Sequence, residues 1–367
     1  MTDRPAPVRI TALDGLRGIA IALVLLHHYV QLKLPLTAGW SSRLEQLLSV
    51  SWSGVDLFFV LSGFLIGGLL MDHRESPRLL RVFYLRRALR ILPLYYVTLI
   101  VLFCWYHVGR YAAVPAWNYF TFTSNHAMAA TGTWDIDPLS VMWSLAVEEQ
   151  FYLVAPWMIL WTRPALLPRV LLAVVGLAWV CRIGTHLADP SGLTSHLLMP
   201  CRMDAFAFGM LAAWATRSGA AREWIARKLP DWRVPLLLAA LPIAVLIGFR
   251  VHIEGWQLPL YGYTCLGVFY ASVVYTVVVR QPAGLVAALS WPPLVSLGRL
   301  SYFIYLWHKL VLASVGRHLL GYIDFSLDSP RNAGVLILVT SITWGLAWIS
   351  WRLFEGPLIR IGQRYAY

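Results

Sequence analysis

Long apolar segments recur along the whole chain and limit its fold more than any other feature. A segment of about twenty mostly apolar residues has the length of a helix that crosses the hydrocarbon core of a bilayer. Such segments lie near residues 10–30, 52–71, 91–107, 144–161, 168–186, 201–216, 234–250, 260–279, 300–319 and 333–352. The sequence therefore predicts an all-α, polytopic integral membrane protein with roughly ten transmembrane helices.

The composition supports the same fold class. Hydrophobic residues make up 59% of the chain and charged residues 13%, and the mean hydropathy is +0.63, far from the average of soluble domains. The sequence contains no internal repeat, low-complexity tract or soluble domain, so residues 1–367 are expected to form a single transmembrane domain. The cysteines form no C-x-x-C pair, and no metal site is expected.

The net charge of +12 indicates membrane topology rather than a nucleic-acid partner. With the N-terminus in the cytoplasm, the segments predicted to face the cytoplasm hold 20 of the 30 Lys and Arg residues, and the outer loops hold 6. This asymmetry is the positive-inside pattern of membrane proteins. It predicts that both termini are cytoplasmic.

The first apolar segment carries ionisable side chains where lipid would make them costly. Asp14 precedes Arg17 by one helical turn, and the eleven-residue step from Arg17 to His28 returns to nearly the same helix face, about 16 Å further along the axis. The ten-residue step to His27 does not. We interpret the stripe as part of a functional site; the alternative is that these residues only end the helix at the two membrane surfaces.

Further charged residues enter the membrane near the predicted depth of His28. Asp56 opens the second segment, WSLAVEEQFYL in the fourth contains Glu148 and Glu149, and RMDAFAFGM in the sixth contains Arg202 and Asp204. Adjacent helical residues point about 100° apart, so at most one of the two glutamates faces a given site squarely. The other is expected to pair with Arg182 or Arg202, or to face water.

The segment 72–90 is the most basic part of the chain, and we expect it to be a cytoplasmic loop. It contains Arg86, Arg87 and Arg90, and on a helix the last two would share a face. Such a cluster either attracts anionic lipid headgroups or binds a phosphorylated ligand. Pro93 follows, where we expect the third span to start with a bend.

Two other segments have informative spacing. In the second span, Ser62, Gly63, Gly67 and Gly68 recur at helical spacing and predict close helix packing. In the ninth span, LGRLSYFIYLWH places Ser301, Tyr305 and His308 on one helix face, flanked by Tyr302. We assign these four ninth-span residues to the donor-binding region; the alternative for His308 is a buried histidine satisfied by a neighbouring hydroxyl.

Taken in order, these motifs resemble the acyltransferase-3 family of bacterial integral-membrane O-acyltransferases. The resemblance covers nearly the whole chain. It rests on LDGLRGIA with His28 eleven residues after Arg17, and then on FFVLSGFLI, FYLRRALRILPLYY, WSLAVEEQFYL, RMDAFAFGM, LGRLSYFIYLWH and the closing FEGP. Many relatives append an esterase-like SGNH domain, and none is expected here.

The resemblance implies a ten-helix core in the bacterial cytoplasmic (inner) membrane. It would move an acyl group, commonly acetyl from cytoplasmic acyl-CoA, to a hydroxyl of a glycan, lipopolysaccharide or lipid-linked sugar at the outer face. By motif position, Arg17 and His28 match the family's arginine and histidine, and Arg87 and Arg90 match its cytoplasmic R-x-x-R. Glu148, or alternatively Glu149, matches the acid of the fourth span.

The residues themselves support this chemistry. Acyl transfer to an alcohol needs a base, charge stabilisation of an oxyanion and a positioned thioester. His28 suits the base, oriented by Glu148 or Asp56. Arg202 suits the oxyanion, and Arg86, Arg87 and Arg90 suit the phosphates of coenzyme A. Arg17, Glu149 and Asp204 complete the candidate catalytic set.

Two other functions fit the same features. A transporter or flippase of a lipid-linked or small anionic substrate would also line its conduit with polar residues, although inverted repeats, which would favour it, are not seen. An O-acyltransferase that modifies a macrolide-type small molecule would share the same site.

Overall fold

The computed structural model describes residues 10–35, 39–105, 107–249, 255–323 and 325–367, and every regular element within them is a helix. The longer helices are α1 (Thr11–Leu25), α3 (Gly54–Asp72), α4 (Leu79–Ile100), α8 (Met142–Trp161), α9 (Leu167–Ala188), α11 (Met199–Arg217), α13 (Arg233–Gly248), α14 (Tyr263–Tyr275), α16 (Pro292–Leu320) and α17 (Pro330–Ser350). The all-α prediction is confirmed for this part of the chain.

Shorter helices connect or extend the long ones. They are α2 (Trp40–Leu48), α5 (Ala116–Phe120), α6 (Ser124–Thr131), α7 (Asp137–Ser140), α10 (Leu193–Leu197), α12 (Gly219–Lys228), α15 (Ala283–Leu289) and α18 (Gly356–Gln363). Single π-helical turns occur at Leu26–Val30, Val101–Trp105, Leu258–Gly262, Thr276–Arg280 and Trp351–Glu355. The first of these turns carries His28, and π-turns are common at functional sites.

Each of the predicted apolar segments overlaps one of the longer helices. Six helical segments of the described chain are long and apolar enough to cross a membrane, or up to eight if each of two bent helix pairs counts as one span. The predicted segments 144–161 and 201–216, which form α8 and α11, are not among these candidate spans. Glu148 and Glu149 lower the apolar character of α8, and Arg202 and Asp204 lower that of α11. The protein is thus a multi-pass membrane protein, and the count of ten stays a prediction.

The basic segment before the third span differs from the prediction. Helix α4 begins at Leu79, so Arg86, Arg87 and Arg90 lie on a helix rather than in a loop. Leu79, Val82 and Phe83 are buried at the three- and four-residue spacing of one helix face, which explains the early start. Pro93 lies inside α4 and does not start it.

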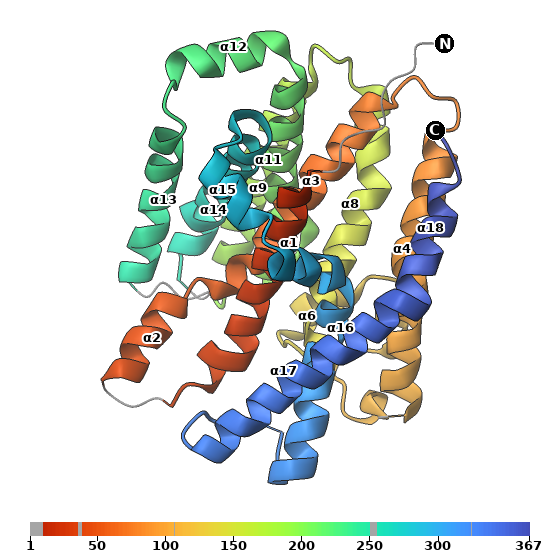
Figure 1. The fold of residues 1–367 in the computed structure, drawn as a ribbon, viewed down its shortest axis with the longest axis vertical. Coiled ribbons are helices and arrows are strands. Elements are labelled where there is room, and N and C mark those ends of the chain that lie inside the picture. The colour runs from red at the N-terminus through yellow and green to blue at the C-terminus, as the bar shows by residue number, and fades with distance from the viewer. Residues whose placement is uncertain (1–9, 36–38, 106, 250–254, 324) are drawn as a thin grey trace.

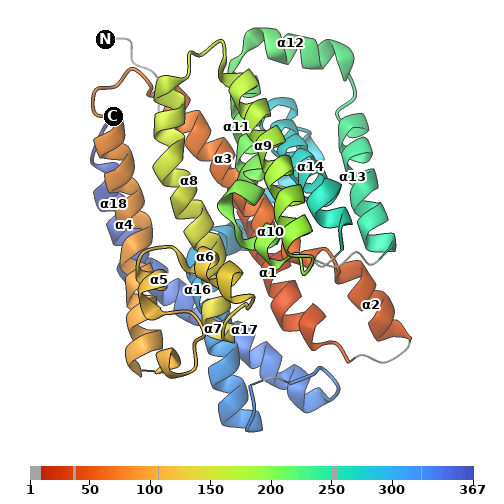
Figure 2. The same ribbon diagram turned by 180° about the vertical axis from the view of Figure 1, so that it is seen from behind.

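The helices run between two ends of an elongated bundle (Figure 1). The α3–α4 and α8–α9 loops, α12 and the end of α18 lie at one end, and the α5–α7 segment and the α16–α17 loop lie at the other. Figure 2 shows the same division from behind, with α4 and α18 on one flank and α12 and α13 on the opposite flank. Loops that the charge pattern predicts on one side of the membrane therefore gather at one end.

Glycines bring the central helices close together. A Cβ on Gly63 of α3 would lie 2.1 Å from the carbonyl oxygen of Phe206 on α11, and one on Gly209 of α11 would lie 2.1 Å from that of Val60. A Cβ on Gly298 of α16 would lie 1.8 Å from the carbonyl oxygen of Asp14 on α1. Because only glycine permits such approach, the prediction of close packing by small residues is confirmed at Gly63.

Candidate active site

A cavity of about 310 Å³ lies where five helices meet. Its lining on α3 runs from Val55 to Leu69, fourteen residues apart, which corresponds to about 21 Å of helix. The polar lining comes from α1, α3, α4, α8 and α16 and comprises Arg17, Ser62, Arg87, Arg90, Ser144, Glu148, Tyr152, Ser301, Tyr302 and Tyr305. The cavity is therefore elongated along the bundle, with charged groups in its wall.

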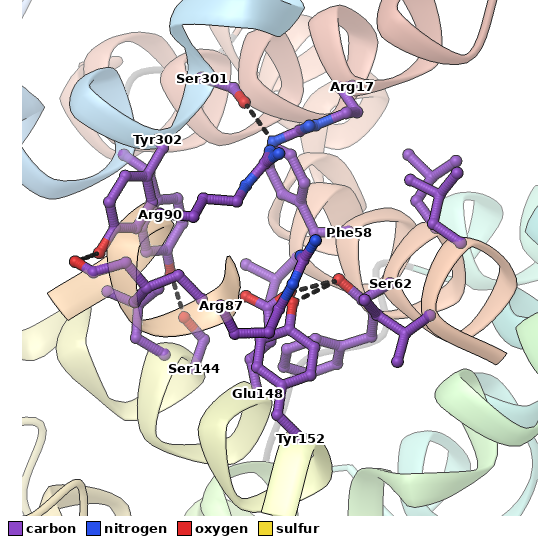
Figure 3. Close-up of a pocket in the computed structure, with 18 of the residues that line it drawn as sticks. Arg17, Phe58, Ser62, Arg87, Arg90, Ser144, Glu148, Tyr152, Ser301 and Tyr302 are labelled. Carbon is purple, nitrogen blue, oxygen red and sulfur yellow. Dashed lines mark hydrogen bonds between the residues drawn. The ribbon is translucent and has the colours of Figure 1, made fainter. Parts of the chain in front are cut away.

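Three guanidinium groups converge on this cavity (Figure 3). Arg17 comes from α1, and Arg87 and Arg90 come from one face of α4. Nη2 of Arg17 donates to the Ser301 hydroxyl at 3.4 Å, and Arg87 lies over the ring of Tyr152 at 5.9 Å. Across the described ranges, none of the three forms an ion pair with a carboxylate. The cavity therefore has the charge to receive an anion.

Glu148 is the carboxylate of the cavity wall. Its Oε1 accepts hydrogen bonds from the hydroxyl groups of Ser62 and Tyr152, and these two hydroxyls lie 3.3 Å apart. These two hydroxyl donors hold the carboxylate in place. One negative charge faces three positive ones, so the cavity keeps a positive excess.

Tyrosine and serine side chains form the wall nearest the start of α8. The Tyr305 hydroxyl lies 2.5 Å from that of Ser144 and 3.3 Å from the carbonyl oxygen of Val141. Tyr302 donates to the carbonyl oxygen of Ile91 at 2.9 Å. Three of the four ninth-span residues, Ser301, Tyr302 and Tyr305, thus line the same cavity as the arginines.

His28 and His308 lie just beyond this end of the cavity. Nδ1 of His28 is 3.2 Å from Nε2 of His308, and the His308 ring centroid is 6.0 Å from that of Tyr305. Neither histidine lines the cavity itself. Arg17 and His28 both contact α16, Arg17 through Ser301 and His28 through His308, but of the two only Arg17 lines the cavity.

Asp56, Arg202 and Asp204 lie in a separate buried cluster. Arg202 pairs with Asp56, and Arg182 pairs with Asp204 at 2.8 Å. The Arg202 guanidinium also stacks over the Tyr263 ring at 3.8 Å. These charges neutralise one another, and none of them lines the cavity. The structure thus gives Arg202 a carboxylate partner of its own and places it away from the cavity.

Two further predicted residues lie outside the cavity lining. Glu149 is the next residue after Glu148 and points elsewhere, as the 100° step requires. Arg86 donates to the carbonyl oxygen of Tyr365 at 2.5 Å and lies over the Tyr367 ring at 4.7 Å. The guanidinium of Arg86 therefore contacts the end of the chain, while Arg87 and Arg90 face the cavity.

The partner predicted for His28 also differs. Glu148 bonds Ser62 and Tyr152, and Asp56 bonds Arg202, so neither carboxylate is the one that orients His28. His308, in turn, bonds carbonyl oxygens and His28 rather than a hydroxyl. A histidine occupies the place where a carboxylate is expected.

Sequence reasoning missed some of the cavity wall. Ser144 and Tyr152 flank the predicted Glu148 at four-residue spacing on one face of α8, a spacing visible in WSLAVEEQFYL. Ser62 was expected only to pack against another helix, yet it donates to Glu148. Within the described residues, no three His, Cys, Asp or Glu side chains gather as metal ligands.

The chain is similar to bacterial O-acetyltransferases over nearly all of its length. Peptidoglycan O-acetyltransferase OatA of Listeria monocytogenes is 27% identical over 384 residues, which cover 98% of this chain and 57% of the relative. O-acetyltransferase OatA of Staphylococcus aureus is 25% identical over 387 residues, which cover 97% of this chain and 58% of the relative. Putative peptidoglycan O-acetyltransferase YrhL of Bacillus subtilis is 28% identical over 381 residues, which cover 97% of this chain and 56% of the relative.

This chain spans less than two thirds of the length of these curated relatives. No solved structure matches it. Residues 10–352 match the family described as the acyltransferase domain. That match includes the arginines, the glutamate and both histidines described above, and the chain therefore belongs to the acyltransferase-3 family.

Proposed function

We propose that this protein is a membrane O-acyltransferase that moves an acyl group, most simply acetyl, from acyl-CoA to a hydroxyl of an extracytoplasmic glycan. The observation that carries the proposal is the elongated cavity in which Arg17, Arg87 and Arg90 face a single carboxylate. Phosphate groups are the anions that guanidinium groups bind most readily. An extended arm that ends in a thioester suits a cavity that follows α3 for about 21 Å.

The proposed direction of transfer follows the bundle. The end with the α3–α4 loop carries the basic segments, so we assign it to the cytoplasm. The donor would enter there, with its phosphates at Arg87 and Arg90. Its thioester would lie toward Tyr305, on the side of the cavity next to His308 and His28. The acceptor hydroxyl would reach His28 from the other end.

The chemical step uses His28 as a general base. His28 takes the proton of the acceptor hydroxyl while its oxygen attacks the thioester carbonyl carbon. The tetrahedral intermediate collapses as the carbon–sulfur bond breaks, and the thiolate of coenzyme A takes the proton back from the imidazolium. An O-acyl ester and the free thiol are the products. Glu148, held by Ser62 and Tyr152, would balance and position the arginines.

The acceptor class is proposed from the relatives. Two of the similar proteins are named for peptidoglycan, so peptidoglycan fragments are the first acceptors to test, followed by lipopolysaccharide and lipid-linked sugars. The bacterial cytoplasmic membrane is the proposed location, because both the donor pool and the outer glycan are accessible from it.

Purified protein in nanodiscs with radiolabelled acetyl-CoA tests the proposal. We expect label to move to one acceptor of the panel, with an acetyl ester identified by mass spectrometry and free coenzyme A released in equal amount. An Arg17→Ala variant should lose transfer while it keeps its helical circular dichroism. Vectorial movement of a labelled lipid-linked sugar without any ester product would support a flippase instead.

A further inference from the structure

We infer that His308 is a positioning residue: it accepts a hydrogen bond from His28 and holds that ring in the tautomer whose Nε2 is free to take a proton. The inference rests on the proposed function only for the role of His28 as the base. His308 lies on α16, and His28 lies in the π-helical turn Leu26–Val30 that follows α1. The two residues are 280 positions apart in the chain. Their hydrogen-bond partners determine where each proton lies.

The proton of neutral His308 lies on Nδ1. This atom is 3.0 Å from the carbonyl oxygen of Ile304 and 2.8 Å from that of Tyr305. A carbonyl oxygen can only accept, so Nδ1 must be the donor. In a neutral imidazole the other nitrogen then carries a lone pair. Nε2 of His308 is therefore an acceptor, and it points at His28.

The proton of neutral His28 lies on Nδ1 as well. This atom is 3.0 Å from the carbonyl oxygen of Val24 and 3.2 Å from Nε2 of His308. Both neighbours are acceptors, so Nδ1 of His28 donates to both. The lone pair of His28 is consequently on Nε2, which has no hydrogen-bond partner in the part of the chain that the structure describes. That atom is the one available to an acceptor hydroxyl.

The surroundings hold His308 in this orientation. Its side chain is fully buried, and its carbonyl oxygen accepts from the Tyr29 hydroxyl at 3.0 Å. The neighbouring Lys309 donates to Asp137 and to Ser140, each at 2.8 Å, so its ammonium has its own carboxylate. The ring of His308 is thus held by burial and by the bonds of its own Nδ1 to the carbonyl oxygens of Ile304 and Tyr305.

A neutral acceptor in this place does the work of the third group in a catalytic triad. In such triads a carboxylate accepts from Nδ1–H of the histidine, fixes its tautomer and stabilises the imidazolium that forms. Here Nε2 of His308 accepts a hydrogen bond from Nδ1 of His28. That hydrogen bond would become stronger when His28 becomes charged. His27 has a different partner, because its Nδ1 lies 2.8 Å from Oε1 of Gln31.

Nitrogen NMR tests the pairing without reference to any reaction. The full chain, labelled with ¹⁵N-histidine in nanodiscs, would be measured at about pH 8, above the ordinary histidine pKa. Signals of His28 are identified by their loss in His28→Asn. We expect a protonated Nδ1 and an unprotonated Nε2 for His28. The opposite tautomer in the wild-type protein would overturn the inference.

Activity of two His308 variants tests the role. His308→Gln keeps a side-chain acceptor in its carbonyl oxygen, whereas His308→Leu removes it. The kcat of the Leu variant should fall at least about 10-fold. The fall should not exceed the loss caused by removing a general base, which is about 10²–10⁴-fold. Its KM for acetyl-CoA should not change. The Gln variant should recover most of the lost kcat. His318→Leu, at an exposed site on the same helix, is the matched control.

The outcomes separate the inference from the function it rests on. Full kcat in His308→Leu, or no recovery in His308→Gln, would overturn the positioning role, provided that His28→Asn is inactive. If His28→Asn itself turns over normally, the base assignment in the proposed function is at fault, and the role of His308 falls with it. A loss confined to KM in His308→Leu would place His308 with the donor site instead.

Discussion

Arg202 on α11 donates a hydrogen bond to Asp56 on α3, and each side chain is only 1% exposed. The same two helices are joined a second time by Arg217 and Asp72, 2.6 Å apart, whose side chains are 35% and 49% exposed. One helix pair thus carries a buried ion pair and an exposed one. Because burial removes the water that would otherwise solvate an unpaired charge, the two pairs should respond very differently to mutation.

Breaking the buried pair should destabilise the protein strongly. Asp56→Ala leaves the Arg202 guanidinium buried without its carboxylate, and we expect a loss of about 3–5 kcal/mol. Arg217→Ala, the control on the exposed pair, should cost at most about 1 kcal/mol. Thermal unfolding in detergent, followed by tryptophan fluorescence, measures both. Equal and small shifts, with activity lost only in Asp56→Ala, would return Asp56 to the catalytic set.

The helix crossing at Gly63 should not tolerate alanine. The added Cβ would lie 2.1 Å from the Phe206 carbonyl oxygen, so α3 and α11 would have to separate. We expect Gly63→Ala to lower the unfolding temperature clearly. Gly184→Ala on α9 is the control, since a Cβ there meets no atom within 4 Å, and this change should be neutral or stabilise by roughly 0.5–1 kcal/mol. A Gly63→Ala protein as stable as the control would contradict the observed closeness of the helices.

The arginines that face the cavity should govern donor affinity. Each lost hydrogen bond to a charged group costs about 1.5–3 kcal/mol, so Arg87→Ala with Arg90→Ala should weaken acetyl-CoA binding at least about 100-fold. Arg86→Ala is the neighbouring control, because Arg86 contacts Tyr365 and Tyr367 rather than the cavity. Isothermal titration in nanodiscs gives both affinities. Unchanged affinity in the double variant would favour an anionic lipid headgroup as the partner of this cluster.

Of the two adjacent histidines, only His28 should be needed for turnover. Removal of a general base typically costs about 10²–10⁴ in rate, so His28→Ala should nearly abolish acetyl transfer. His27→Ala should stay largely active, because His27 bonds Gln31 rather than His308. Initial rates at saturating acetyl-CoA decide between them. Substantial activity in His28→Gln, which keeps a polar group without a base, would assign His28 to positioning and leave Glu148, the carboxylate of the cavity wall, to be tested next.

The end of the bundle with the basic segments should face the cytoplasm. Reporter fusions after Ser76, in the α3–α4 loop, and after Tyr367 should behave as cytoplasmic. A fusion after Gly132, between α6 and α7, should behave as periplasmic. If the Ser76 and Gly132 fusions reported the same side, the proposed path from donor to acceptor through the bundle would have no basis.

Membrane character and the approximate positions of the long helices follow from the sequence alone. Runs of apolar residues about twenty long have one stable arrangement in a bilayer, because a helix satisfies its own backbone hydrogen bonds. The order of the motifs likewise identifies the family without coordinates. Helical spacing correctly places Arg87 and Arg90 on one face and separates Glu148 from Glu149.

Partner choice between distant segments was decided only by the tertiary structure. The sequence offers Arg202 several carboxylates and His28 at least two, and spacing within one helix cannot choose among them. The choice depends on how each helix is rotated and how closely it approaches its neighbours. Glycines such as Gly63 permit that close approach. As a result Asp56 pairs with Arg202, Glu148 with Ser62 and Tyr152, and His28 with a histidine rather than a carboxylate.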